Sequence, residues 1–91
     1  MNRIIKIGPL AIGQLFVLSD YKALVKFGEQ DGQLFVWLLE DLEGQSNLKT
    51  KNYLIVGTGR AFEPNFIHQE TVITSAGMVW HLLQEYNPLV G

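Results

Sequence analysis

Cysteine is absent from this 91-residue chain, and charged residues make up only 18% of it. Without cysteine there can be no disulfide, no catalytic thiol and no thiolate metal site. Seven basic and nine acidic residues leave a formal net charge of −2. The chain therefore lacks the excess of positive charge that marks a protein binding nucleic-acid backbones, and we expect no direct contact of that kind.

Long hydrophobic runs are also missing. The longest, residues 34–39, is far too short to span a bilayer, and no apolar stretch near the start indicates a signal peptide. We expect no association with a membrane. Hydrophobic residues nevertheless amount to 47%, which excludes a disordered chain, and a chain of this length predicts a single domain over residues 1–91.

The hydrophobic residues occur in short, β-rich stretches separated by glycine, a pattern typical of strands. We expect an all-β fold, or a β-rich α+β fold, made of a small antiparallel sheet or sandwich of six or seven short strands. It would hold at most one short helix, either one turn capped by Ser19 or a segment before Pro88. The expected strands cover residues 4–7, 14–18, 23–28, 33–40, 51–57, 66–73 and 78–85.

The dipeptide Asp31-Gly32 lies between two apolar stretches and is typical of a two-residue hairpin turn of type I′. Such a turn fixes the register, which places Lys26 across from Trp37 and Val25 across from Leu38. One face of the hairpin is then expected to be core: Val25, Phe27, Leu34, Val36 and Leu38. The other face carries Leu24, Lys26, Phe35, Trp37 and Leu39.

The hairpin face with Trp37 is too apolar to be left in water. A second sheet of the same chain could cover it, or a second copy of the chain related by a two-fold axis. We expect a homo-oligomer, most simply a dimer, with Trp37 at or beside the interface. Lys26 is expected to lie against the Trp37 indole in a cation–π contact.

A glycine-bounded turn followed by arginine, Gly57-Thr58-Gly59-Arg60, ends another expected strand. Backbone amides in such a turn can point at an anion, and a guanidinium can add two hydrogen bonds to a phosphate. The known phosphate-binding motifs do not match, so the turn could simply end the strand. Our hypothesis is that these four residues bind an anion while Trp37 or Tyr53 stacks on a base.

Two histidines and a glutamate form a polar cluster if residues 74–77 make a four-residue hairpin loop. That loop places Glu70 across from His81, with His68 diagonal to it. Two imidazoles and a carboxylate can bind iron, and an imidazole beside a carboxylate can act as a general base. A cross-strand pair that only stabilises the sheet is the commoner arrangement. We therefore expect no metal, no cofactor and no catalytic residue, and a protein that is not an enzyme.

Four sequence elements resemble those of a family of short, uncharacterised proteins of tailed phages and prophages, classed as a domain of unknown function. They are Lys-x-x-Pro-Leu at residues 6–10, the stretch from Asp-Gly to Trp at residues 31–37, Ile-Val-Gly-Thr-Gly at residues 55–59, and Gly-Met-Val-Trp-His-Leu at residues 77–82. The family usually has His-Pro where this chain has Arg60-Ala61. It also has Gly-Thr in place of Glu70-Thr71, so a ligand contact at the turn would differ here.

The resemblance implies a setting and carries no assigned activity. It suggests a small phage protein acting in the cytoplasm of a bacterial host. We expect a non-enzymatic binding protein that antagonises a host defence system by sequestering a nucleotide-like signal at an oligomer interface. The alternatives are a protein–protein inhibitor that caps a host defence protein, and an accessory protein of the virion.

Overall fold

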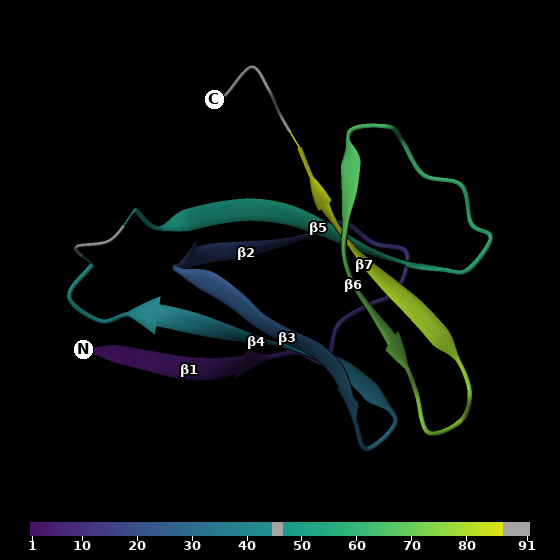
Figure 1. Ribbon diagram of the computed structural model, residues 1–91, viewed down its shortest axis with the longest axis horizontal. Coiled ribbons are helices and arrows are strands. Elements are labelled where there is room, and N and C mark those ends of the chain that lie inside the picture. The colour runs from purple at the N-terminus through teal and green to yellow at the C-terminus, as the bar shows by residue number, and fades with distance from the viewer. Residues whose placement is uncertain (45–46, 87–91) are drawn as a thin grey trace.

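The computed structural model describes residues 1–44 and 47–86 and confirms the all-β fold (Figure 1). Seven strands follow one another along the chain, and the described residues contain no helix, so none that could cross a membrane. The helical turn expected at Ser19 is wrong because that residue lies within a strand; Pro88, before which the alternative helix was expected, lies outside the described residues. The strands are β1 (Asn2–Ile7), β2 (Phe16–Tyr21), β3 (Ala23–Gln30), β4 (Gln33–Asp41), β5 (Lys49–Gly57), β6 (Phe66–Ile73) and β7 (Val79–Glu85).

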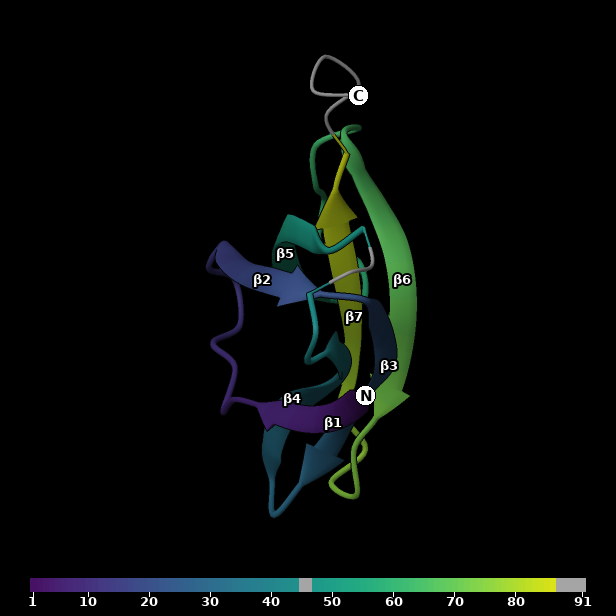
Figure 2. The same ribbon diagram turned by 90° about the vertical axis from the view of Figure 1, so that its left-hand side faces the viewer.

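The strands form two antiparallel sheets, one in the order β1-β4-β3 and one in the order β2-β5-β7-β6. Figure 2 shows β2 and β5 above β1 and β4, and the core side chains fill the space between them. In Figure 1, β6 and β7 run steeply across the direction of β2 and β5, so the four-stranded sheet is strongly twisted. The fold is thus two sheets that pack on one shared core.

Both sheets contribute large side chains to that core. The most deeply buried are apolar or aromatic: Leu18, Tyr21, Phe27, Leu34, Val36, Leu38, Tyr53, Ile55 and Leu82. The hydroxyls of Tyr21 and Tyr53 share a hydrogen bond, and the Tyr53 hydroxyl also donates to Gln84 Oε1 at 3.4 Å. The two polar atoms that enter the core therefore satisfy each other. Burial raises the pKa of both phenols, and the shared bond raises that of Tyr53 further.

The first hairpin has the expected turn, because Asp31 and Gly32 both have positive φ, at 54° and 80°. Lys26 lies across from Trp37 as predicted. A β-bulge between Leu24 and Lys26 then shifts the register, so Leu24, and not Val25, pairs with Leu38. The prediction is wrong for these two residues: Leu24 packs on the core, whereas Val25 is 50% exposed.

The second hairpin has a longer loop than expected. Gly77 has a φ of 83°, and its amide donates to the carbonyl of Thr74, while the Thr74 amide donates to the carbonyl of Met78. This is a turn followed by a left-handed residue, the usual form of a hairpin with a glycine bulge. Consequently Ile73 pairs with Val79 instead of Met78.

The shifted register changes the surroundings of Glu70, which lies across from Leu82 and not from His81. Its Oε2 accepts a 2.8 Å hydrogen bond from the amide of Phe27 on β3. On the same edge, Glu29 of β3 accepts a 2.7 Å bond from the amide of Ser75. Two carboxylates thus join the β3 edge of one sheet to β6 and its hairpin loop in the other.

Replacing Glu70 should test this link. Glu70→Ala leaves the partly buried Phe27 amide without an acceptor, and we expect a loss of about 1–3 kcal/mol in the free energy of unfolding. Glu70→Gln keeps an acceptor oxygen and should lose less. Glu63→Ala is the control, because it removes an exposed carboxylate that has no partner in the described part of the chain. Urea denaturation in which Glu63→Ala costs as much as Glu70→Ala would contradict the link.

The tyrosine pair predicts how stability depends on alkaline pH. Because the folded protein holds both phenol protons beyond the ordinary pKa of 10.0, stability is full below that pH and falls as the unfolded chain ionises. Each tyrosine that stays protonated should contribute a slope of about 1.4 kcal/mol per pH unit. The double variant Tyr21→Phe/Tyr53→Phe should lose this slope in urea denaturation between neutral and alkaline pH; the same slope in both proteins would contradict the account.

Candidate functional site

The candidate site lies where β5 extends beyond the end of its neighbour β2. The pairing of these strands begins at Phe16 and Tyr53, so residues 54–57 have no strand on that side. A loop passes there instead, and its Gly13 amide donates to the carbonyl of Ile55 at 2.9 Å. The two loops around residues 8–15 and 58–65 therefore flank an open stretch of strand edge.

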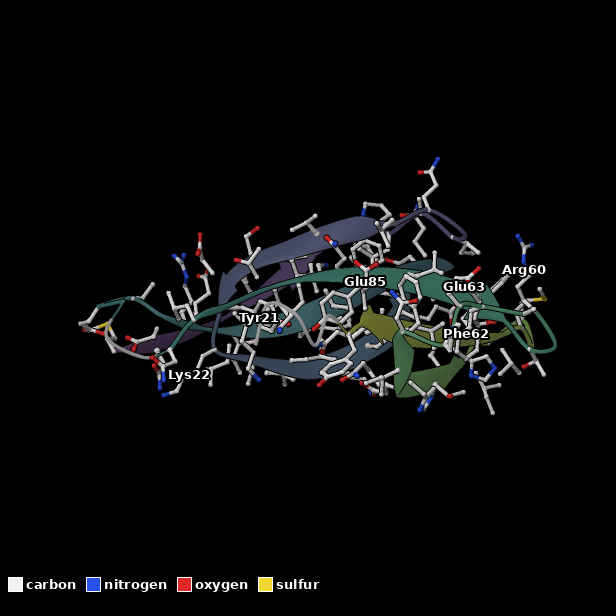
Figure 3. The ribbon with its side chains drawn as sticks, turned by 90° about the horizontal axis from the view of Figure 1, so that it is seen from above. Tyr21, Lys22, Arg60, Phe62, Glu63 and Glu85 are labelled. Carbon is white, nitrogen blue, oxygen red and sulfur yellow. The ribbon has the colours of Figure 1, made fainter. Side chains whose placement is uncertain are left out.

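A hollow of about 460 Å³ occupies this place. Its size is within the range of small-molecule pockets, which are mostly apolar with a few polar groups. Apolar and aromatic side chains provide most of the lining, namely Ile12, Leu54, Ile55, Val56, Phe62, Phe66 and Trp80. Arg60 and Glu63 provide the charges, and Figure 3 shows Arg60, Phe62 and Glu63 gathered at one end of the molecule.

Neither charged side chain has a partner among the described residues. In the described residues, the side chains of Arg60 and Glu63 make no hydrogen bond and no ion pair, and Figure 3 shows the Arg60 guanidinium reaching away from the strands. The other arginine differs, because Arg3 binds Glu40 through Nε and Nη2 at 2.9 and 2.7 Å. A ligand in the hollow could thus satisfy a cation and an anion without breaking any internal contact.

Trp80 forms the inner wall of the hollow. It lies across from Gly57, and a Cβ at that position would approach the indole to 3.4 Å. The indole therefore lies within van der Waals reach of the end of β5. A second hollow of about 310 Å³ shares Trp80 and Ile12 with the first. One indole thus borders two neighbouring cavities.

The turn after β5 is present, and one of its amides is used within the turn itself. The Arg60 amide donates to the Gly57 carbonyl at 3.2 Å, and Gly59 has a φ of 88°. The Thr58 hydroxyl is hydrogen-bonded to His81 Nε2 at 2.8 Å. Of the four expected turn residues, Gly57 and Arg60 line the hollow, and Arg60 is the one that can bind an anion through its side chain.

The two aromatic residues expected to stack on a base lie elsewhere. Tyr53 is only 1% exposed and bonded to Tyr21, so its prediction as a stacking residue is wrong. Trp37 lies on the outer face of the three-stranded sheet, across from Lys6 and Lys26. The aromatic residues at the hollow are Phe62, Phe66 and Trp80.

The expected interface residues are only partly together. Phe35, Trp37 and Leu39 are half-buried on the outer sheet face beside the exposed Lys26, whereas Leu24 belongs to the core. The cation–π contact of this face is between Lys6 Nζ and the Phe35 ring at 4.8 Å. The apolar patch is therefore smaller than expected, and it is bordered by two lysines.

The expected polar cluster is also rearranged. His68 and His81 do come together, with ring centroids 6.0 Å apart, but Glu70 faces β3 instead. Thr71 takes its place across from His81. Within residues 1–44 and 47–86 no group of three or more histidine, cysteine or acidic side chains could hold a metal.

Four residues that line the hollow were not predicted from the sequence as site residues: Ile12, Phe62, Glu63 and Phe66. They come from irregular loops or a strand end, where the period of hydrophobic residues gives no information. Phe62 did carry a signal, since a large aromatic side chain in a short loop is unusual unless it packs on something or binds something. The predicted site was instead built on the glycine turn that precedes Phe62.

The comparisons with known proteins agree with the resemblance seen in the sequence only at the level of the family. Nothing among curated proteins matches the chain significantly, and the same is true of solved structures. One family model matches residues 1–90, which is nearly the whole chain. The chain therefore belongs to the family described as Domain of unknown function (DUF7352).

Proposed function

We propose that this protein is a non-enzymatic binding protein, and that the hollow beside β5 takes a small anionic ligand with a planar ring, such as a nucleotide. The observation that carries the proposal is a pair of charges, Arg60 and Glu63, on the rim of a cavity lined by aromatic side chains; neither has a side-chain partner within residues 1–44 and 47–86. A guanidinium binds phosphate with two parallel hydrogen bonds. A carboxylate accepts hydrogen bonds from the amino and ring N–H groups of a base.

Binding without catalysis fits the lining of the hollow. Its described residues include one carboxylate and one guanidinium, together with apolar side chains and glycines. Acid–base or nucleophilic chemistry usually needs a histidine, a hydroxyl or a second carboxylate within hydrogen-bond reach of the first group. Stacking of a base on Phe62 or Trp80 would contribute about 1–3 kcal/mol.

The wider role that we propose is that of a phage protein, acting in the cytoplasm of a bacterial host, that antagonises a defence system by sequestering its nucleotide-like signal. Support for this role comes from the resemblance to phage and prophage proteins. The hollow adds a place where such a signal would fit.

Calorimetry against AMP, ADP and cyclic nucleotides tests the ligand class. We expect binding of a phosphate-bearing member of this panel, and Arg60→Ala should weaken it roughly 10- to 100-fold, because hydrogen bonds to charged groups contribute about 1.5–3 kcal/mol. Adenosine, which has no phosphate, should not distinguish Arg60→Ala from the unaltered protein.

Arg3→Ala provides the matched control, since it removes the same side chain from the other sheet. If no nucleotide binds, or if Arg3→Ala weakens binding as much as Arg60→Ala, the proposed ligand class is wrong.

A second candidate function is protein binding by the outer face of the three-stranded sheet, either as a homo-oligomer or as an inhibitor that caps a host protein. Trp37 and Phe35 lie together there with ring centroids 6.2 Å apart, and Ile4 is 57% exposed. Aromatic side chains of this kind often anchor interfaces. Because Lys6 and Lys26 lie on either side of Trp37, an acidic partner would suit this face.

Analytical ultracentrifugation distinguishes these arrangements. For a homo-oligomer we expect the unaltered protein to sediment as a dimer at tens of micromolar and Trp37→Glu to sediment as a monomer, with Arg60→Ala unchanged. A monomer for the unaltered protein would end the oligomer proposal and leave a different protein as the partner of this face.

A further inference from the structure

A continuous chain of hydrogen bonds crosses the outer face of the four-stranded sheet. Thr58 Oγ1 lies 2.8 Å from Nε2 of His81, and Nδ1 of His81 lies 2.8 Å from Thr71 Oγ1. The same Thr71 oxygen lies 2.8 Å from Nε2 of His68. Two imidazole nitrogens from neighbouring strands therefore point at one atom.

The β-bulge in β6 produces this convergence. The register shifts between His68 and Glu70, so that Gln69 is an extra residue in the strand. His68 and Thr71 consequently lie on the same face, and Thr71 lies directly across from His81. Bulges often re-aim side chains in this way next to functional sites.

The number of available protons determines which hydrogen bonds the two imidazoles and Thr71 can form together. The Thr71 hydroxyl has one proton, so it can donate to only one of the two nitrogens, and the other must donate its own proton to the oxygen. If the Nε2–H of His81 donates to Thr58, the Nδ1 of His81 has a free lone pair. In that arrangement His68 donates its Nε2–H to Thr71 Oγ1. If the Thr71 hydroxyl rotates away, His68 can hold its proton on Nδ1 instead, which has no bonding partner among the described residues. Both lone pairs then aim at the point that the hydroxyl oxygen occupied.

We propose that His68 and His81 form a bidentate site for a divalent first-row transition-metal ion, with Thr58 as the positioning residue for His81. Neutral imidazole suits copper, nickel and zinc. Metal–nitrogen bonds are about 2.0–2.1 Å long, whereas each imidazole nitrogen lies 2.8 Å from Thr71 Oγ1. Both rings must therefore move inward to bind an ion at this point. The Thr71 hydroxyl gives way by rotation about its Cα–Cβ bond, and water completes the coordination.

In established metal sites, a group that does not touch the metal often holds a histidine ligand in place, and Thr58 would do this for His81. A histidine ligand usually donates its second ring N–H to a nearby acceptor, which fixes the tautomer and the ring orientation. The Thr58 oxygen lies at the right distance from Nε2 of His81 to accept that bond. A metal at this site would contradict the expectation of no metal drawn from the sequence. The site does not depend on the proposed nucleotide ligand.

Calorimetric titration of the untagged protein with CuCl2 and ZnCl2 tests the site. The chain has two histidines and no cysteine, so no other imidazole or thiol competes. We expect one ion per chain, with Cu²⁺ bound more tightly than Zn²⁺ in keeping with the usual order of these metals. His68→Gln and His81→Gln should each lose this binding, and Thr58→Val should weaken it about tenfold.

Glu70→Gln is the matched control, because the proposed site does not contain Glu70 and its affinity should not change. The ring protons of both histidines should broaden together in proton NMR spectra when Cu²⁺ is added, and thermal melting would verify that each variant is folded. Absence of binding, binding that persists in either histidine variant, or broadening of only one ring would overturn the proposal.

Discussion

The hydrogen bond from the Phe27 amide to the Glu70 carboxylate is the contact that joins the two sheets along one side of the molecule. The edges of β3 and β6 lie close to each other but belong to different sheets. A carboxylate from one edge can supply the acceptor that a missing ladder would otherwise provide. With Glu29 and Ser75 making a similar bond near the hairpin tip, the twisted four-stranded sheet is held over the shared core.

The bulged stretch of β6 also determines which side chains lie on the outer face of the four-stranded sheet. The extra residue at Gln69 sends Glu70 toward β3 and leaves His68 and Thr71 on the outer face with His81. The hollow has a comparable origin in a strand that ends early. Since β2 pairs with β5 only as far as Tyr53, the end of β5 is left to the loops, and those loops bring Arg60, Phe62 and Glu63 to the rim. Irregularities in an otherwise regular sheet thus create both candidate sites.

Much of the fold could be predicted from the sequence, because its strands have local signals. The Asp31-Gly32 turn fixed the pairing of Lys26 with Trp37, and alternation identified Phe27, Leu34, Val36 and Leu38 as core. Register failed at Val25, where a bulge intervenes, and from Ile73 to Glu70, where the hairpin loop is one residue longer than expected. A bulge inserts one residue and reverses the faces that follow, and nothing in the alternation of side chains marks its position.

The candidate site could be predicted only in part. Gly57 and Arg60 were found from the turn that they flank, whereas Phe62 and Glu63 depend on how an irregular loop returns to β6. Tyr53 was misassigned because its hydroxyl is satisfied by Tyr21, a contact between residues 32 positions apart that no local pattern reveals. Trp37 lies on the outer face of one sheet, as the hairpin register predicted, whereas Trp80 packs against the shared core from the other sheet.

That separation of the two tryptophans allows the most direct test of the proposed ligand site. Incorporation of 5-fluorotryptophan gives the protein two fluorine NMR resonances, one from Trp37 and one from Trp80, which Trp37→Phe would assign. Addition of a nucleotide that binds in the hollow should shift the Trp80 resonance and leave that of Trp37 in place. A shift of the Trp37 resonance alone, or of neither resonance at saturating nucleotide, would contradict the account.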